Sequence, residues 1–197
     1  VLLLNPDTLV TDNTGTLTEG KPAIAKIMAV PRLTESDVLR LAASLERASE
    51  HPLAAAIMDA AAAQKLDLDE VLGFRTIPGK GLVGAIDGRA VAFGNLKLLE
   101  GLAVDPGDLR KHAEILRRNG RTIMFLAIDG KAAGLISVAD PVKASALETL
   151  RELRNEGIHI VMVTGDNKTT ADAVASKLGI DDVRADVGAV VAGELAA

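Results

Sequence analysis

The chain has 197 residues, 48% hydrophobic and 25% charged, which is an ordinary soluble composition for one large or two small domains. Its formal net charge of -5, without a basic stretch, argues against nucleic acid as a partner. The lack of cysteine excludes disulfides and thiolate metal sites. No apolar run approaches the roughly 20 residues of a membrane helix, and the first residues do not resemble a signal peptide. We therefore expect the chain itself to be cytosolic.

The first quarter of the chain predicts two strands and then two helices. The run "DTLVTD" is typical of a buried strand that ends at Asp12, and residues 23–30 are typical of a second strand. Thr34 and Asp37 have the spacing of a capping box, so a helix should begin there. Pro52 suits the first turn of a second helix.

The middle of the chain has a different pattern, with short apolar runs separated by glycines. Asp87-Gly88 and Asp129-Gly130 each stand between two apolar runs, where a two-residue turn with positive φ is favoured. Two such hairpins predict an antiparallel sheet.

After residue 139 the pattern alternates helix and strand. Asp140 should cap a helix whose first residue is Pro141, and Gly157 should end it. A buried strand at residues 158–163, a polar loop and a helix ended by Gly179 follow. Such alternation is typical of a parallel sheet wound with helices.

The predicted fold class is therefore α/β, with an antiparallel α+β domain inserted into a parallel wound domain. We place the wound domain at residues 1–20 and 138–197, where it looks incomplete, and the inserted domain at residues 21–137.

Two of the predicted strands end in polar loops that contain glycine, "TDNTGTLT" and "TGDN". In wound parallel sheets, ligands bind outside the carboxyl ends of the strands. If strands 7–12 and 158–163 are neighbours, Asp12 lies close to Thr164 and Gly165. An aspartate there could accept a phosphoryl group whose oxygens are held by small donors. Spacing alone leaves a second interpretation open, because these residues are also common turn formers and helix caps.

Five segments, in order, resemble the heavy-metal-transporting P-type ATPases: "DNTGTLTEGKP", "SEHPLA", "PGKGLVG", "FGN" and "VMVTGDN". The first resembles the family's phosphorylation motif, and "SEHPLA" with "PGKG" is specific to the heavy-metal subclass. The resemblance spans nearly the whole chain. It implies a haloacid-dehalogenase-like domain with an inserted nucleotide-binding domain, in a protein that exports a metal, with copper as the expected one.

The resemblance also implies cofactors, partners and site residues. The cofactors are ATP and Mg²⁺, and the γ-phosphate goes to Asp12. Mg²⁺ is assigned to the Asp12 carboxylate and the Thr14 carbonyl, and Thr16, Thr164, Gly165 and Asp166 complete the catalytic set. ATP binding is assigned to Glu46, His51, Gly79, Gly81, Gly94 and Asn95. The region would lie on the cytoplasmic side of a membrane beside the membrane and actuator domains of its own chain, and the fragment alone should be a monomer.

An ordinary role stays open for several of these residues. His51 could be a capping or core histidine, Glu46 could lie on a solvated helix face, and the glycines could belong to a plain hairpin turn. If Gly81 is a surface ligand, substituting it should weaken ATP binding and leave the melting temperature nearly unchanged. His112 and His159 match no motif, and we expect them on a helix surface and in a strand.

The chain departs from the family at two places. Asn13 stands where the family has a lysine, which removes a cation beside Asp12. No lysine follows Lys177, and the family's GDG loop with its Mg²⁺ carboxylate is not found. We therefore expect the chain alone to form little or no aspartyl-phosphate. Two alternatives follow: a nucleotide-binding module without turnover, or a soluble phosphatase of the same superfamily. The phosphatase is disfavoured because Thr14 occupies the place of its usual second aspartate.

Overall fold

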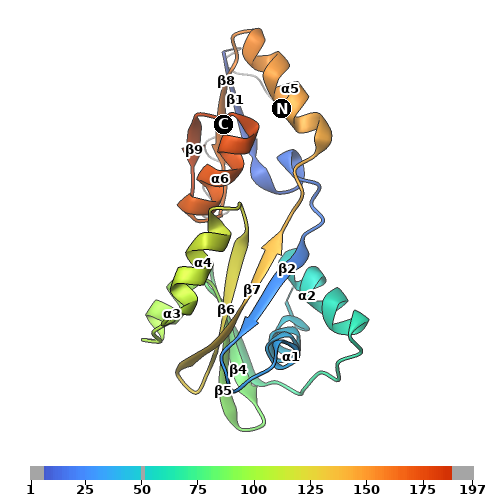
Figure 1. Ribbon diagram of the computed structural model, residues 1–197, viewed down its shortest axis with the longest axis vertical. Coiled ribbons are helices and arrows are strands. Elements are labelled where there is room, and N and C mark those ends of the chain that lie inside the picture. The colour runs from blue at the N-terminus through green and yellow to red at the C-terminus, as the bar shows by residue number, and fades with distance from the viewer. Residues whose placement is uncertain (1–6, 50–51, 188–197) are drawn as a thin grey trace. The chain divides into compact units, whose positions relative to one another are not determined.

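The structure is a computed structural model that describes residues 7–49 and 52–187. The chain divides into two compact units (Figure 1). The first unit consists of Val1–Lys21, Arg117–Arg121 and Asp140–Ala197, and the second of Pro22–Leu116 and Thr122–Ala139. That the first unit is phosphorylated and the second binds the nucleotide stays a prediction.

The first unit contains a parallel sheet in the order β1-β8-β9. Its strands are β1 (Thr8–Asp12), β8 (His159–Val163) and β9 (Asp182–Arg184). β1 and β8 are hydrogen-bonded neighbours, with Asp12 opposite Val163, so the predicted adjacency of these two strands is confirmed. Helices α5 (Ala144–Asn155) and α6 (Lys168–Leu178) share an aliphatic core with the sheet, formed around Leu150, Ile160, Met162 and Leu178.

The start of α5 differs from the prediction. The helix begins at Ala144, and neither Asp140 nor Pro141 belongs to it. The Asp140 carboxylate instead accepts hydrogen bonds from the Thr18 hydroxyl at 2.6 Å and from the Lys21 amide at 3.1 Å. The N-cap position is occupied by Lys143, three residues after Asp140, and makes no side-chain capping bond. The predicted end of α6 is confirmed, since Gly179 caps it with φ at 68°.

The second unit contains an antiparallel sheet in the order β2-β7-β6-β5-β4-β3. The strands are β2 (Ala23–Ala29), β3 (Leu72–Ile77), β4 (Gly81–Ile86), β5 (Arg89–Gly94), β6 (Thr122–Ile128) and β7 (Lys131–Ala139). The two predicted hairpins are confirmed: β4 pairs with β5 and β6 with β7, and all four residues of the two Asp-Gly turns have positive φ.

Two pairs of helices cover the two faces of this sheet (Figure 1). Helices α1 (Glu35–Glu46) and α2 (Pro52–Ala63) pack with Phe93 and Leu126, whereas α3 (Leu96–Gly101) and α4 (Leu109–Arg117) pack with Ala92 and Phe125. Adjacent strand residues point to opposite faces, which separates the two cores. The predicted capping box is present at Thr34 and Asp37. Among the helices that the structure describes, none is long and apolar enough to cross a bilayer.

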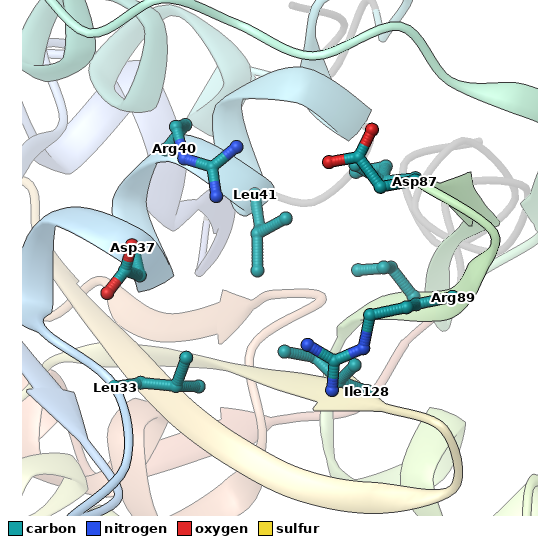
Figure 2. Close-up of a pocket in the computed structure, with 9 residues that line it drawn as sticks. Leu33, Asp37, Arg40, Leu41, Asp87, Arg89 and Ile128 are labelled. Carbon is teal, nitrogen blue, oxygen red and sulfur yellow. The ribbon is translucent and has the colours of Figure 1, made fainter.

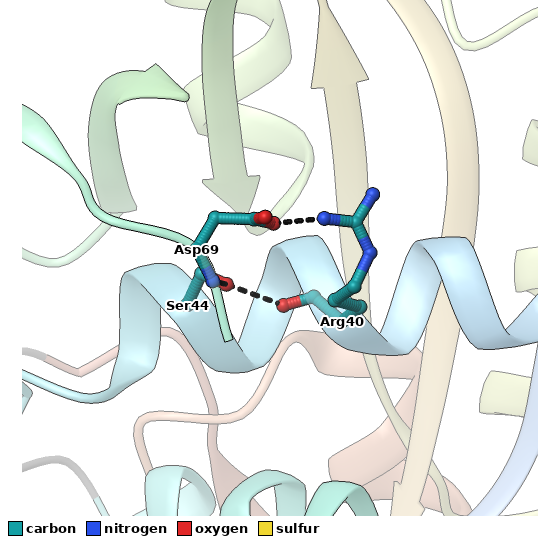
Figure 3. Close-up of polar contacts among 3 residues, drawn as sticks. All are labelled: Arg40, Ser44 and Asp69. Carbon is teal, nitrogen blue, oxygen red and sulfur yellow. Dashed lines mark hydrogen bonds and ion pairs between the residues drawn. The ribbon is translucent and has the colours of Figure 1, made fainter. Parts of the chain in front are cut away.

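Polar contacts fasten the connection between α2 and β3 onto α1 (Figure 3). The buried Ser44 hydroxyl donates to the Arg40 carbonyl at 2.8 Å and accepts from the Asp69 amide at 2.9 Å. The Arg40 guanidinium forms an ion pair with the Asp69 carboxylate. This stretch carries no regular secondary structure up to β3, so these bonds give its backbone a fixed course along the helix.

Candidate functional site

The turn Asn13–Leu17 follows β1 directly and is held by its own hydrogen bonds. The Thr18 amide donates to the Asn13 carbonyl at 3.1 Å, and the Gly15 amide donates to the Thr18 hydroxyl at 3.0 Å. Gly15 has φ at 76°, a conformation that favours glycine. Three predicted site residues are all exposed here: Asp12 at the end of β1, and Thr14 and Thr16 in the turn. Hydrogen bonds within the loop thus fix its backbone, while these three side chains remain accessible to solvent.

A second predicted loop lies beside this turn because β1 and β8 are parallel and in register. The side-chain Nδ2 of Asn13 donates to Asp166 Oδ2 at 3.2 Å, which joins the two loops. Thr164, which is buried, bonds to the same carboxylate oxygen at 3.2 Å. Gly165 is exposed between them. The six residues predicted for catalysis therefore gather at one edge of this sheet: Asp12, Thr14, Thr16, Thr164, Gly165 and Asp166.

Sequence reasoning missed two contributors to this edge. The sequence indicates Asn13 only as the place of a missing cation, yet this residue is 5% exposed and its side chain bridges the two loops. Its Oδ1 has no hydrogen-bond partner within the described part of the chain. Lys143 was not singled out at all, although its ammonium group donates to the Gly15 carbonyl at 2.8 Å. No local spacing signals either contact, because both partners are far away in the sequence.

Two oxygen donors at this edge of the sheet suit binding of one magnesium ion. The Asp12 carboxylate is exposed, and one of its oxygens accepts a hydrogen bond from the Asn13 backbone amide at 2.7 Å. This carboxylate and the Thr14 carbonyl are both hard oxygen ligands. Among residues 7–49 and 52–187 there is no group of three or more His, Cys, Asp or Glu side chains that could hold a metal. Mg²⁺ commonly uses one or two carboxylates together with waters and substrate phosphates, so these donors fit it.

The residues predicted to bind ATP lie at one end of the antiparallel sheet. Gly81 and Gly94 face each other at the ends of β4 and β5, opposite the Asp87-Gly88 turn. Asn95 caps α3 and donates to the Gly79 carbonyl at 2.8 Å, which ties that loop to the helix. His51 lies outside the described residues.

Helix α1 runs along the sheet toward the same end. Its first half contributes Asp37 and Arg40 to a small pocket near the opposite end, together with Asp87 and Arg89 of the hairpin (Figure 2). Glu46 is the last residue of the helix, so it lies toward the end that carries the paired glycines. Gly79, Gly81, Gly94 and Asn95 therefore lie together at this end of the sheet, and Glu46 lies at the end of α1 that is farther from Asp37 and Arg40.

Glu46 is not on a solvated helix face, so that alternative was wrong. The residue is 2% exposed, and its Oε2 has no hydrogen-bond partner among the residues described. Burial raises the pKa of this carboxyl, and a hydrogen bond from Ser49 opposes the rise. A buried acceptor without a partner is costly unless a ligand supplies the donor. Glu46 is therefore suited to accept a hydrogen bond from a bound molecule.

The expectation that Gly81 can be substituted without loss of stability was also wrong. A Cβ on Gly81 would lie 2.3 Å from the Phe93 carbonyl oxygen and 2.5 Å from the Gly94 Cα. A Cβ on Gly94 would lie 2.2 Å from the Lys80 carbonyl oxygen. The two glycines allow β4 and β5 to approach each other, whereas Gly79, with nothing within 4 Å of its Cβ direction, lies in an open loop. His112 and His159 are exposed on α4 and β8, as predicted.

The model of the haloacid dehalogenase-like hydrolase family matches residues 6–194, so the chain belongs to this family. It is 50% identical to a copper-transporting P-type ATPase of Rhizobium leguminosarum bv. viciae over 92% of this chain and 22% of that protein. The chain therefore spans less than a quarter of that relative. The resemblance to heavy-metal P-type ATPases that the motifs predict is confirmed.

The solved structures that are similar to this chain include two of metal-transporting ATPase domains. The catalytic domain of the CPx-ATPase CopB-B matches with a TM-score of 0.69 and 25% identity, over 92% of this chain and 61% of that one. The N-domain of HMA8, a copper-transporting P-type ATPase, matches with a TM-score of 0.52 and 29% identity, over 59% of this chain and 99% of that one. Together with the family match, these similarities confirm the predicted fold class.

We predict that Gly81→Ala destabilises the protein by about 3 kcal/mol or more, because a Cβ there must push strand backbone aside. Gly79→Ala is the matched control: its φ is also positive, at 68°, but the loop is open, so the cost should be only about 1 kcal/mol. Urea unfolding of both variants measures the difference. Equal losses would contradict the role of Gly81 in strand packing.

We predict that Glu46→Gln changes how stability depends on pH. A carboxyl whose pKa is raised in the folded state contributes stability below its unfolded value of 4.5 and loses it as pH rises through the folded value. The variant cannot ionise, so its free energy of unfolding should match that of the unmodified chain below pH 4.5. It should exceed it increasingly as pH rises from there to the folded pKa, and by a constant amount above that pKa. Urea unfolding between pH 4 and 8 tests this, with Glu35→Gln at the exposed start of α1 as the charge control. A constant difference across this range would contradict the prediction.

Proposed function

We propose that this chain is the ATP-binding and phosphorylation region of a heavy-metal P-type ATPase that exports copper, and that ATP phosphorylates Asp12. The observation that carries this proposal is the parallel register of β1 and β8, which sets the "TDNTGTLT" loop beside the "TGDN" loop. The similarity to copper-transporting ATPases over nearly the whole chain supports the substrate class. In the whole transporter, this region would work with the membrane and actuator domains of its own chain, on the cytoplasmic side of the membrane.

The chemistry is a direct transfer between oxygens. An Asp12 carboxylate oxygen attacks the γ-phosphorus of ATP, the bond from that phosphorus to the β,γ-bridging oxygen breaks, and ADP leaves with the electron pair. The Thr16 hydroxyl and the Gly165 amide would donate hydrogen bonds to the moving oxygens. The Thr164 hydroxyl would do so by exchanging its bond to Asp166 Oδ2 for one to the phosphate. Mg²⁺, held by the Asp12 carboxylate and the Thr14 carbonyl, would neutralise charge on the phosphates.

The second unit would hold the nucleoside part of ATP. Its buried Glu46 offers an acceptor that suits the exocyclic amino group of adenine. Gly79 lies in an open loop where a ligand can approach the backbone, and Asn95 keeps that loop in place. Gly81 and Gly94 would act through the strand geometry that supports this loop. A contact between His51 and ATP remains part of the proposal.

One observation favours a second candidate, a nucleotide-binding module that does not turn over. Asn13 replaces the family's lysine, and its side chain is buried against Asp166. The position next to Asp12 therefore carries no positive charge that could stabilise the transferring phosphoryl group. Binding and transfer are separate measurements, and they distinguish the two candidates.

We predict that Mg²⁺-ATP added to the ¹⁵N-labelled chain shifts the amide resonances of residues 46–49, 79–84 and 94–95. Glu46→Leu removes the acceptor at similar volume and should weaken ATP binding about tenfold, which corresponds to one lost hydrogen bond. Glu35→Gln, at the exposed start of α1, should bind ATP like the unmodified chain. Shifts that avoid these segments would contradict the assignment of the nucleotide site.

We predict that the chain alone, incubated with γ-³²P-ATP and Mg²⁺, forms little or no acid-stable label. Asp12 and Thr14 supply only part of a metal shell, and no cation lies at position 13. Asn13→Lys should raise labelling only slightly. Any label should be sensitive to hydroxylamine and absent from Asp12→Asn. Robust labelling that Asp12→Asn abolishes would refute the expected inactivity and support Asp12 as the acceptor, whereas label retained in Asp12→Asn would exclude Asp12.

A further inference from the structure

We infer that Asp140 and Lys143 are positioning residues for the loop that follows Asp12. Together with Thr18 they hold the Gly15 backbone from both sides, which fixes the directions of the Thr14 carbonyl and the Thr16 amide. The inference rests on the proposed function in one respect, namely that this loop is the one that accepts the phosphoryl group.

The first arm runs from Gly15 through Thr18 to Asp140. The Gly15 amide donates to the Thr18 hydroxyl at 3.0 Å, and that hydroxyl lies 2.6 Å from Asp140 Oδ2. The Asn13 carbonyl is a second possible acceptor but is 3.3 Å away. A hydroxyl has one proton, and the shorter, charge-assisted bond to the carboxylate is the stronger one. Because Thr18 is only 2% exposed, water competes little for this bond.

This arm controls the Thr14 carbonyl through the planarity of the peptide bond. The Thr14 carbonyl and the Gly15 amide belong to one peptide unit, and the described chain contains no cis peptide bonds. In a planar trans peptide the two groups point in opposite directions. Fixing the Gly15 amide toward Thr18 therefore fixes the direction of the carbonyl that is proposed as a magnesium ligand.

The second arm is Lys143, whose ammonium group donates to the Gly15 carbonyl at 2.8 Å. That carbonyl shares a peptide unit with the Thr16 amide, so the same planarity fixes the Thr16 amide. Gly15 is free of side-chain crowding, since nothing lies within 4 Å of its Cβ direction. The polar contacts on its two sides therefore restrain a backbone that steric packing leaves open.

The backbone around these residues keeps both arms in place. The Glu19 amide donates to the Pro141 carbonyl at 2.8 Å, and the Lys143 amide donates to the Leu17 carbonyl at 2.9 Å. Thr18 and Val142 form an antiparallel bridge between these two bonds. The Lys21 amide donates to the second Asp140 oxygen at 3.1 Å, which orients the carboxylate toward Thr18.

The first test measures the loop itself in the whole chain. Thr18→Val keeps the shape of the side chain and removes the hydroxyl, so hydrogen exchange of the Gly15 amide should accelerate at least about fivefold. Lys143→Met should shift the Thr16 amide resonance. Thr18→Ser and Lys143→Arg should restore the original values, and Lys168→Met, which removes an exposed lysine on α6, should change neither. The inference would be overturned if Thr18→Val left the exchange rate of the Gly15 amide unchanged and Lys143→Met left the Thr16 amide resonance unchanged.

The second test uses Mn²⁺ as a probe, following its broadening of the Asp12 and Thr14 amide resonances. Lys143→Met removes a positive charge, so charge alone predicts that Mn²⁺ binds more tightly. A positioning role predicts weaker binding instead. The Mn²⁺ concentration that broadens these resonances by half should be at least about threefold higher in both Lys143→Met and Thr18→Val. Tighter binding in Lys143→Met would overturn the inference.

The two tests separate the inference from the proposed function. If Mn²⁺ broadens no resonance of this loop in the unmodified chain, the magnesium assignment fails, and the amide measurements still decide the positioning role. If Thr18→Val does not fold, Lys143→Met decides alone, because its side chain makes an exposed contact whose removal leaves the core untouched.

Discussion

The first unit depends on the pairing of β1 with β8. β1 is a strand of five residues and β8 is its only neighbour in the described sheet. Their register puts Asp12 opposite Val163, and each strand is followed at once by a polar loop. The buried side chains of β8, Ile160 and Met162, anchor the pair to α5 and α6. A shift of one residue in this register would turn those side chains to the other face, so the core also sets how the two loops meet.

Much of the fold could be predicted because its signals are local. The Asp-Gly turns need positive φ at both positions, and the structure has it at Asp87, Gly88, Asp129 and Gly130. The capping box at Thr34 is equally local. Asp140 shows where such reasoning fails. An aspartate before a proline is a common helix start, but here Thr18, 122 residues earlier, takes the carboxylate. Tertiary contacts of this kind override a local preference.

In the candidate site, too, the local signals could be predicted and the long-range contacts could not. Motifs identified the residues of both loops, and the parallel register brought them together. The contacts that hold the loops were not predictable, since Asn13 reaches Asp166 across 153 positions and Lys143 reaches Gly15 across 128. The expectation that Gly81 can be substituted without loss of stability was wrong for a related reason. Its sequence context suggests an approach to a ligand, whereas the closest approach is to the neighbouring strand.

The position of the second unit within the chain has a consequence for the order of folding. β1 and β8 are about 150 residues apart, and closing so long a loop is entropically expensive. The first and last strands of the second unit pair with each other, with Ala23 opposite Ala139. Once that unit has formed, only about 30 residues remain free between β1 and β8. The logarithmic dependence on loop length lowers the closure cost by roughly 1.4 kcal/mol, about tenfold in an equilibrium constant. The parallel sheet around Asp12 therefore assembles more easily after the antiparallel one.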